Sequence, residues 1–310
     1  MFPLWIPITF AAAFFQCVRT ALQRQLRASE LSTNGATFTR YFYSFPLAIL
    51  YLASLMWLTD LPWLAPNGWF LFYCLLGGGA QILATSLLIY LFSLRNFVVG
   101  TTYSKTEVIQ TAAFGFILLG DPVGPVGIIA ILISLSGVVL LSQAKNTDQG
   151  RGLRALMRQL VTAWGQREAW IGLICGALFA IAAVGVRAAS LSLGGDGFLI
   201  ESAMTLAFMT TLQTIILGFY LFLREREQLR LVIISWRKSA LVGLFSVLGS
   251  AGWFSAMTLQ NAAYVRALGQ VELVFTFITS RFIFGERSSR TELAGVVLVA
   301  GGILLLLVGR

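Results

Sequence analysis

Histidine is absent from this 310-residue chain, and cysteine and charge are scarce. Without histidine there are no imidazole metal ligands and no Ser-His-Asp mechanism. Cys17, Cys74 and Cys175 lie in apolar runs without CxxC spacing, which indicates small buried side chains and not a metal site or a disulfide framework. No nucleotide-binding loop precedes a strand–helix unit. The sequence therefore predicts no metal, no cofactor and no catalytic residue, and it argues against an enzyme.

Charged residues make up only 11% of the chain and hydrophobic residues 57%, whereas soluble domains carry about 25% charged residues. A chain this apolar needs lipid as its solvent. Each membrane-crossing helix takes roughly 20 mostly apolar residues. Such runs occur at 3–22, 35–58, 68–92, 97–119, 123–143, 169–191, 197–223, 239–259, 264–284 and 291–309. We therefore predict an all-α integral membrane protein with ten transmembrane helices.

A basic linker at 144–168 separates the fifth and sixth of these runs. Its apolar residues recur at helical spacing, and its arginines fall on the other side of the same helix. The apolar positions are Leu153, Leu156, Met157, Leu160, Val161 and Trp164, and the basic ones are Arg151, Arg154 and Arg158. This pattern predicts an amphipathic helix in the headgroup plane, or a plain surface helix that joins two halves.

The two halves on either side of this linker share an unusual pattern. A shift of 165 residues aligns Glu107 with Glu272, and Asp121 with Glu286. Because charges inside a membrane are rare, the coincidence indicates a duplication. Residues 1–143 and 169–310 would then be two five-helix repeats. An odd number of helices places such repeats upside down to one another, which is the architecture of alternating-access transporters.

The motifs of both halves carry a resemblance to a known family. The stretch from Lys105-Thr-Glu-Val-Ile-Gln to Leu118-Leu-Gly-Asp-Pro, followed by a small-residue run at 127–141, resembles the EamA family of the drug/metabolite transporter superfamily. The second half repeats the pattern around Glu272, in Phe284-Gly285-Glu286 and at 295–307. Arg40 also resembles an arginine often found early in the second helix of that family. The resemblance implies transport across a membrane by two five-helix units.

The chain departs from this family pattern at one point in each half. Val108 and Leu273 follow the two glutamates, where the family commonly has proline. Because proline removes a backbone hydrogen bond and bends a helix, we expect these two helices to be less kinked. Elsewhere, the Gly172-Leu-Ile-Cys-Gly176 spacing predicts a close helix–helix contact.

The distribution of basic residues indicates an orientation. Most of the 22 Lys and Arg lie in the connections after the first, third, fifth, seventh and ninth helices. By the positive-inside rule these connections face the cytoplasm and both termini lie outside, whereas the family resemblance implies cytoplasmic termini. The net charge of +9 is thus a topology signal that requires no nucleic acid. We expect a bacterial inner-membrane location, a small-molecule substrate and the lipid bilayer as partners, and a monomer or homodimer.

Ionisable residues inside the predicted helices are the candidates for a transport site, because a central charge costs about 2.5–3.5 kcal/mol on insertion scales. The candidates are Arg40, Lys105, Glu107, Arg187, Glu201, Arg266 and Glu272. Arg19 and Arg281 are placed where they can snorkel to a membrane surface. The remaining set is slightly positive, which favours a ligand with a carboxylate or phosphate, although a zwitterion would use both signs.

Two alternatives stay open for the glutamate pair. Glu107 and Glu272 either have a structural role, in which they cap broken helix ends or hold the upstream Lys105 and Arg266, or they contact substrate or a proton directly. Five aromatic residues are candidates for lining the transport route: Tyr41, Tyr90, Tyr103, Trp253 and Tyr264. The alternative is that they pack between helices or lie at the membrane surfaces.

Three functions remain possible from the sequence. The first is a secondary transporter for a small polar metabolite such as an amino acid or organic acid. The second is a flippase for a lipid or a lipid-linked sugar. The third is a membrane-embedded transferase, which the isolated interfacial acids and the lack of histidine make least favoured.

Overall fold

The protein is described from a computed structural model. The structure describes residues 3–27, 31–60, 62–94, 97–144, 167–195, 197–282 and 289–309. Within these ranges all regular secondary structure is helical, which confirms the all-α prediction. The predicted amphipathic linker helix lies outside the described residues, as does the Gly285-Glu286 pair.

Seven helices in the described ranges are long and apolar enough to cross a membrane. They are α1 (Trp5–Arg27), α2 (Thr33–Thr59), α3 (Gly68–Ser93), α8 (Arg167–Ser192), α9 (Phe198–Arg224), α11 (Trp236–Leu259) and α14 (Arg290–Val308). A shorter apolar stretch lies in α6 (Pro125–Ala144). Large apolar side chains project outward from these elements; Trp57 and Val308 are each 80% exposed. Such an apolar surface suits lipid as the solvent, so the chain is an integral, multi-pass membrane protein.

Two of the ten predicted helices are each divided into two shorter ones. The predicted helix at 97–119 consists of α4 (Phe97–Ser104) and α5 (Glu107–Leu119), and that at 264–284 consists of α12 (Ala262–Gly269) and α13 (Val271–Phe282). An additional short helix, α10 (Arg226–Ile234), occupies the connection between α9 and α11. The expectation of less kinked helices at Val108 and Leu273 is therefore wrong, because each helix ends just before its glutamate and no proline is needed there.

The chain divides into two compact units that both take residues from each half of the sequence. The first unit contains Met1–Ile82 and Ile181–Val265, and the second contains Leu83–Ala180 and Arg266–Arg310. Helices α3 and α8 therefore contribute residues to both units. The predicted repeats, 1–143 and 169–310, were defined by similarity between two parts of the sequence and do not coincide with these spatial units. The repeats therefore stay a prediction.

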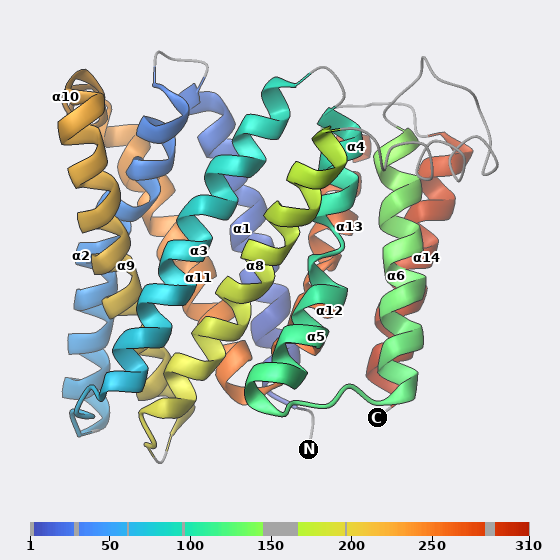
Figure 1. Cartoon of the computed structure of the whole chain (residues 1–310), viewed down its shortest axis with the longest axis horizontal. Helices are drawn as coiled ribbons and strands as arrows, with labels where there is room; N and C mark the ends of the chain where they lie inside the picture. The colour runs from blue at the N-terminus through green and yellow to red at the C-terminus, as the bar shows by residue number, and fades with distance from the viewer. Residues whose placement is uncertain are drawn as a thin grey trace. The chain divides into compact units, whose positions relative to one another are not determined.

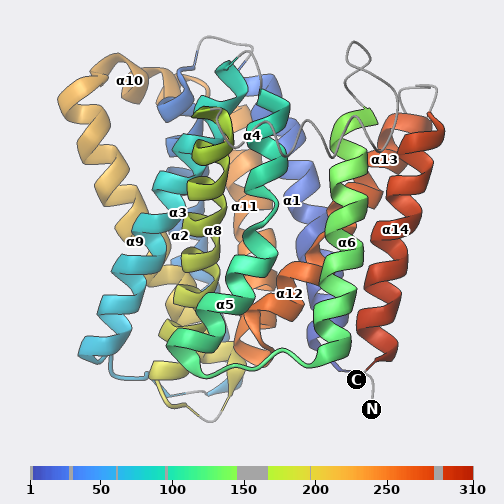
Figure 2. The ribbon, with the colours of Figure 1, turned by 45° about the vertical axis from the view of Figure 1, so that its right-hand side comes forward.

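In the first unit, α11 packs against α1, α2 and α9, while α2 also packs against α9. Close approach is possible because glycines replace larger side chains at the crossings. A Cβ added to Gly252 would lie 2.8 Å from the Cβ of Ala12 on α1. Figure 2 shows α10 across the end of α9, where it contacts α2 and α9. One core cluster of this unit consists of Leu31, Ala36, Phe38, Tyr41, Ile82, Leu217, Leu221, Val232 and Val242.

In the second unit, α6 and α14 lie side by side along their lengths (Figure 1). The contact again depends on glycine: a Cβ on Gly137 would lie 2.6 Å from the backbone oxygen of Gly295. Small residues let helix backbones approach closely in lipid, where no hydrophobic effect drives association. Helix α14 starts with a capping box, in which the Ser289 hydroxyl accepts from the Glu292 N–H and the Glu292 carboxylate accepts from the Ser289 N–H.

Candidate functional site

The second unit contains two helix breaks at corresponding positions. At the first break, the N–H groups of Lys105 and Thr106 donate to carbonyls three residues back, each over 3.1 Å. At the second, the Gln270 N–H donates to the Ala267 carbonyl over 3.2 Å. Such three-residue bonds tighten the end of a helix and satisfy its last carbonyls. Adding 165 to the bounds of α4 reproduces those of α12, and Glu107 and Glu272 follow the breaks directly.

Four charges meet at these breaks and form what we call the charge quartet: Lys105, Glu107, Arg266 and Glu272. Arg266 Nη2 donates to Glu107 Oε1 over 2.7 Å, and Lys105 Nζ donates to Glu272 Oε1 over 3.2 Å. The pairs are crossed, because each cation binds the glutamate that follows the other break. Lys105 cannot face Glu107 on a regular helix, since side chains two positions apart point in different directions. The quartet therefore carries no net charge.

Each glutamate also lies in the first turn of a helix, where a carboxylate interacts favourably with the helix dipole. The quartet is thus consistent with a structural role for Glu107 and Glu272. Lys105 and Arg266 are the two cations that the sequence suggested, but each binds the glutamate of the other break and not the one that follows it in the chain.

The predicted glycine contact of α8 is confirmed beside the first break. A Cβ on Gly176 would lie 2.9 Å from the Ser104 carbonyl oxygen, and one on Gly172 would overlap the Gly100 carbonyl.

Two further candidates, both in the first unit, bind backbone groups. Arg187 Nη1 donates to the carbonyls of Met257 and Thr258 over 2.8 and 3.2 Å, at the C-terminal end of α11. A cation at this end satisfies free carbonyls and complements the dipole. Glu201 is buried, and its Oε1 accepts a 2.8 Å bond from the Gly195 N–H. That bond holds the turn before α9, where Gly194 has a φ of +63° that favours glycine.

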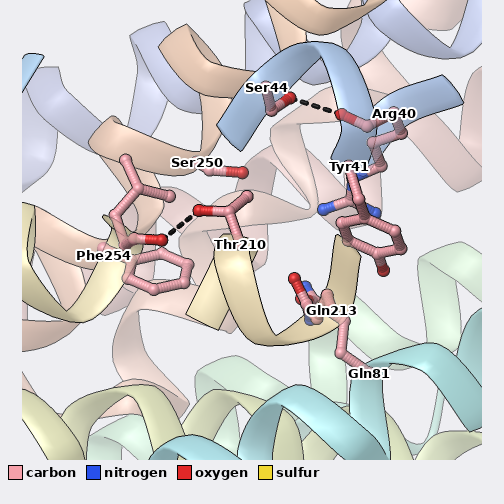
Figure 3. A pocket seen from close by; sticks show the side chains of 9 residues that line it. Arg40, Tyr41, Ser44, Gln81, Thr210, Gln213, Ser250 and Phe254 are labelled. Carbon is pink, nitrogen blue, oxygen red and sulfur yellow. Dashed lines mark hydrogen bonds between the residues drawn. The ribbon is translucent and has the colours of Figure 1, made fainter. Parts of the chain in front are cut away.

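The remaining candidate, Arg40, lines a pocket of the first unit (Figure 3). Four helices supply the lining: α2 with Arg40, Tyr41 and Ser44, α3 with Gln81, α9 with Leu206, Thr210 and Gln213, and α11 with Ser250 and Phe254. About 240 Å³ lies between these side chains, part of it open. In this conformation the pocket has room for about one water molecule. A larger ligand therefore requires the helices to move apart.

Arg40 supplies the positive charge of this pocket. Its guanidinium carbon lies 5.2 Å from the centre of the Tyr41 ring, and in the described part of the chain no carboxylate lies within ion-pair distance of it. The Tyr41 ring is buried, and its hydroxyl has no hydrogen-bond partner among the described residues. Gln213 Nε2 donates to Gln81 Oε1 over 2.7 Å and to the Gly78 carbonyl over 3.2 Å. A cation beside uncharged hydroxyl and amide groups can bind a carboxylate or phosphate.

Of the five predicted cavity aromatics, Tyr41 lines this pocket and the other four lie elsewhere. Trp253 is buried, and its Nε1 donates to Gln16 Oε1 over 3.0 Å. Tyr103 is buried beside Ala169 in the second unit, and Tyr90 is exposed. Tyr264 is half-buried on α12.

The sequence analysis missed the uncharged polar residues of the pocket, namely Ser44, Gln81, Thr210, Gln213 and Ser250. A usable signal existed for the two glutamines, since an amide inside an apolar run needs a hydrogen-bond partner in lipid. The serine and threonine residues gave none, because their hydroxyls can bind the carbonyl four residues back on their own helix. Ser44 and Thr210 both do so.

Residues 167–308 match the sequence model of the EamA-like transporter family. This match confirms the resemblance. The matched region is an EamA-like transporter domain of the drug/metabolite transporter superfamily, whose members are membrane transporters and not enzymes. No curated protein matches the chain.

The fold likeness extends over both halves. One crystal structure among the matching solved structures superposes on the chain with a TM-score of 0.70 at 14% sequence identity, and the match covers 98% of this chain and 96% of that chain. At this identity the likeness shows the fold alone. The matched part includes the first half of the chain, which the family model does not cover.

Proposed function

We propose that this EamA-like protein is a secondary transporter for a small anionic metabolite that binds at Arg40. The observation that carries the proposal is a guanidinium in a polar, helix-lined pocket whose lining contains no carboxylate. An unpaired cation inside a membrane is costly unless a counter-charge arrives with the ligand. A carboxylate or phosphate provides that charge and can form two parallel hydrogen bonds with the guanidinium.

The same lining favours an anion over a zwitterion. An amino acid would also present an ammonium group, and a buried charge needs an opposite charge beside it, which a lining without a carboxylate does not supply. Here Ser44, Thr210 and Ser250 provide hydroxyls, and Gln81 and Gln213 provide amides that already bond to each other. These groups suit an organic acid with hydroxyl or carbonyl substituents.

The proposed mechanism is alternating access between two inverted five-helix repeats that together cross the membrane ten times. The two helix breaks, which are 165 residues apart, support this architecture, as do crossed pairs that join one half of the sequence to the other. Broken helices near a pseudo-symmetry axis are typical of such carriers. Because the quartet is neutral, we assign it to holding the breaks together and assign substrate charge recognition to Arg40.

We further propose that the odd-numbered connections face the cytoplasm of a bacterial inner membrane and that both termini lie outside. The concentration of arginine and lysine in those connections supports this orientation. The partners would be the substrate and the bilayer, without nucleic acid. A chain that carries both repeats can function as a monomer or as a homodimer.

The proposal is tested with purified protein in liposomes that contain no other transporter. Uptake of labelled organic acids, sugar phosphates and amino acids would be compared for wild type, Arg40→Lys and Arg40→Ala. We expect organic acid uptake that falls at least about tenfold in Arg40→Ala, since a charged hydrogen bond contributes about 1.5–3 kcal/mol. Arg40→Lys should keep part of the activity, because it retains the charge without the planar fork.

Arg167→Ala is the matched control, because it removes the same guanidinium from an exposed position at the start of α8, outside the pocket. Equal uptake by Arg40→Ala and Arg167→Ala would refute the role of Arg40. Movement of a labelled lipid across the bilayer, with no uptake of soluble solutes, would point instead to the flippase.

A further inference from the structure

A second charged surface lies at one end of the first unit, outside the residues that line the pocket. It is formed where α9 ends, along α10 and where α11 begins (Figure 2). We call it the basic corner and define it by five exposed cations, Arg224, Arg226, Arg230, Arg237 and Lys238.

The acidic residues within this segment do not neutralise the basic corner. Glu225 accepts hydrogen bonds from the Ser32 hydroxyl and the Asn34 amide, each over 2.6 Å, so its carboxylate is directed to the start of α2. Glu227 is exposed. Among the described residues, no carboxylate lies within ion-pair distance of any of the five cations. The surface therefore carries a clear excess of positive charge.

Exposed apolar side chains lie among these cations. They are Phe222, Leu223, Ile233, Ile234 and Trp236, each 50–63% exposed. Two of the arginines lie over aromatic rings: the guanidinium carbon of Arg226 is 4.6 Å from the Phe222 ring centre, and that of Arg237 is 5.6 Å from that of Trp236. Cations next to exposed aromatic and aliphatic groups are typical of the boundary between headgroups and acyl chains.

The opposite face of α10 is firmly packed, so the basic corner is a fixed surface. Val232 is fully buried, and its carbonyl accepts a 3.1 Å bond from the Tyr43 hydroxyl. Gln228 Oε1 accepts from the Ser32 N–H over 2.7 Å. The 27 residues of α9 extend about 40 Å at 1.5 Å per residue. This length exceeds a hydrocarbon layer of about 30 Å, so an end of α9 reaches headgroup depth.

We propose that the basic corner binds the headgroups of acidic phospholipids. The negatively charged headgroup, with its phosphate, would contact Arg226, Arg230, Arg237 and Lys238. The acyl chains would cover Ile233, Ile234 and Trp236. A nucleic acid would satisfy the charges but leave these apolar side chains uncovered, whereas a phospholipid carries both a negative headgroup and apolar chains. The site is separate from the Arg40 pocket, so it does not depend on the proposed transport function.

The test uses the full chain in nanodiscs made of phosphatidylcholine alone or mixed with phosphatidylglycerol. The readouts are the midpoint of thermal unfolding and the ratio of the two lipids retained after mild extraction. Near a membrane each Lys or Arg contributes about a fivefold preference for anionic lipid. We expect wild type to retain phosphatidylglycerol preferentially and to unfold at a higher temperature in its presence, both effects weakening with salt.

Two variants move the preference in opposite directions. Arg230→Gln with Lys238→Gln should reduce it by about 25-fold, and Glu227→Gln should increase it by up to about fivefold. Both variants should unfold like wild type in phosphatidylcholine alone, because the altered side chains are exposed. If the double variant unfolds at a lower temperature than wild type in phosphatidylcholine alone, its lipid preference is not interpreted, and the result for Glu227→Gln alone tests the proposal. The proposal is wrong if wild type shows no preference for phosphatidylglycerol, or if neither variant changes it.

Discussion

Neutralising one member of the charge quartet tests how the two helix breaks are held. In the Arg266–Glu107 pair the atoms are 2.7 Å apart and the side chains are 17% and 9% exposed. Glu107→Gln keeps the size of the side chain but leaves the Arg266 guanidinium without its carboxylate. Breaking a buried pair from one side costs about 3–5 kcal/mol, because the remaining charge stays desolvated. We expect a loss near the lower end, since Arg266 is not fully enclosed.

The second pair provides the matched comparison within the same cluster. The Lys105 and Glu272 atoms are 3.2 Å apart, and the side chains are 27% and 21% exposed. The atoms of this pair are farther apart and its side chains are less enclosed by protein, so Glu272→Gln should cost less than Glu107→Gln. The double variant Glu107→Gln/Arg266→Gln should lose less than Glu107→Gln alone, because it removes both charges together.

The assay is unfolding of the purified protein in detergent, followed by helical signal, with the apparent free energy compared between the single and double variants. The reasoning fails if Glu272→Gln destabilises as much as Glu107→Gln. It also fails if the losses of Glu107→Gln and Arg266→Gln simply add in the double variant, because additivity would mean that the two charges do not interact.

Two packing predictions accompany this one. Gly137→Ala should lower the apparent free energy of unfolding by about 1–3 kcal/mol, because its Cβ would lie 2.6 Å from the Gly295 carbonyl oxygen. Gly79→Ala is the control, because no neighbouring atom lies within 4 Å of its Cβ. It should leave the unfolding midpoint unchanged or slightly raised. Ser289→Ala should cost about 1 kcal/mol by removing the cap on α14, whereas Ser289→Thr should keep most of it; equal midpoints for both variants would show that the cap does not contribute.

The membrane-spanning helices could be predicted because lipid imposes a local rule. Every backbone group in the hydrocarbon layer must bond within its own helix, so the apolar run by itself specifies the element. The predicted run 197–223 corresponds to α9 at Phe198–Arg224, and 68–92 corresponds to α3 at Gly68–Ser93. The glycine spacing of Gly172 and Gly176 likewise predicted a close contact that the structure contains.

The same rule could not predict where the two helices break. The first break, at Lys105-Thr106, contains neither proline nor glycine, and the second follows Gly269, although glycines also occur inside unbroken helices such as α3 and α11. A break there is stable because its freed polar groups and charges find partners on other segments. Gln110, for example, donates to Thr106 Oγ1 over 3.0 Å and to the Leu173 carbonyl over 3.4 Å.

The sequence by itself determined that this chain is helical, lies in a membrane and carries a small set of intramembrane charges that require compensation. Only the tertiary structure decided how each charge is compensated. It brought Arg266 to Glu107 and Lys105 to Glu272, directed Arg187 and Glu201 to backbone groups, and left Arg40 in a pocket of uncharged polar side chains. The physical reason is range: hydrophobicity sums over neighbours in the chain, whereas an ion pair depends on a distance of a few ångströms between residues that are more than 150 positions apart.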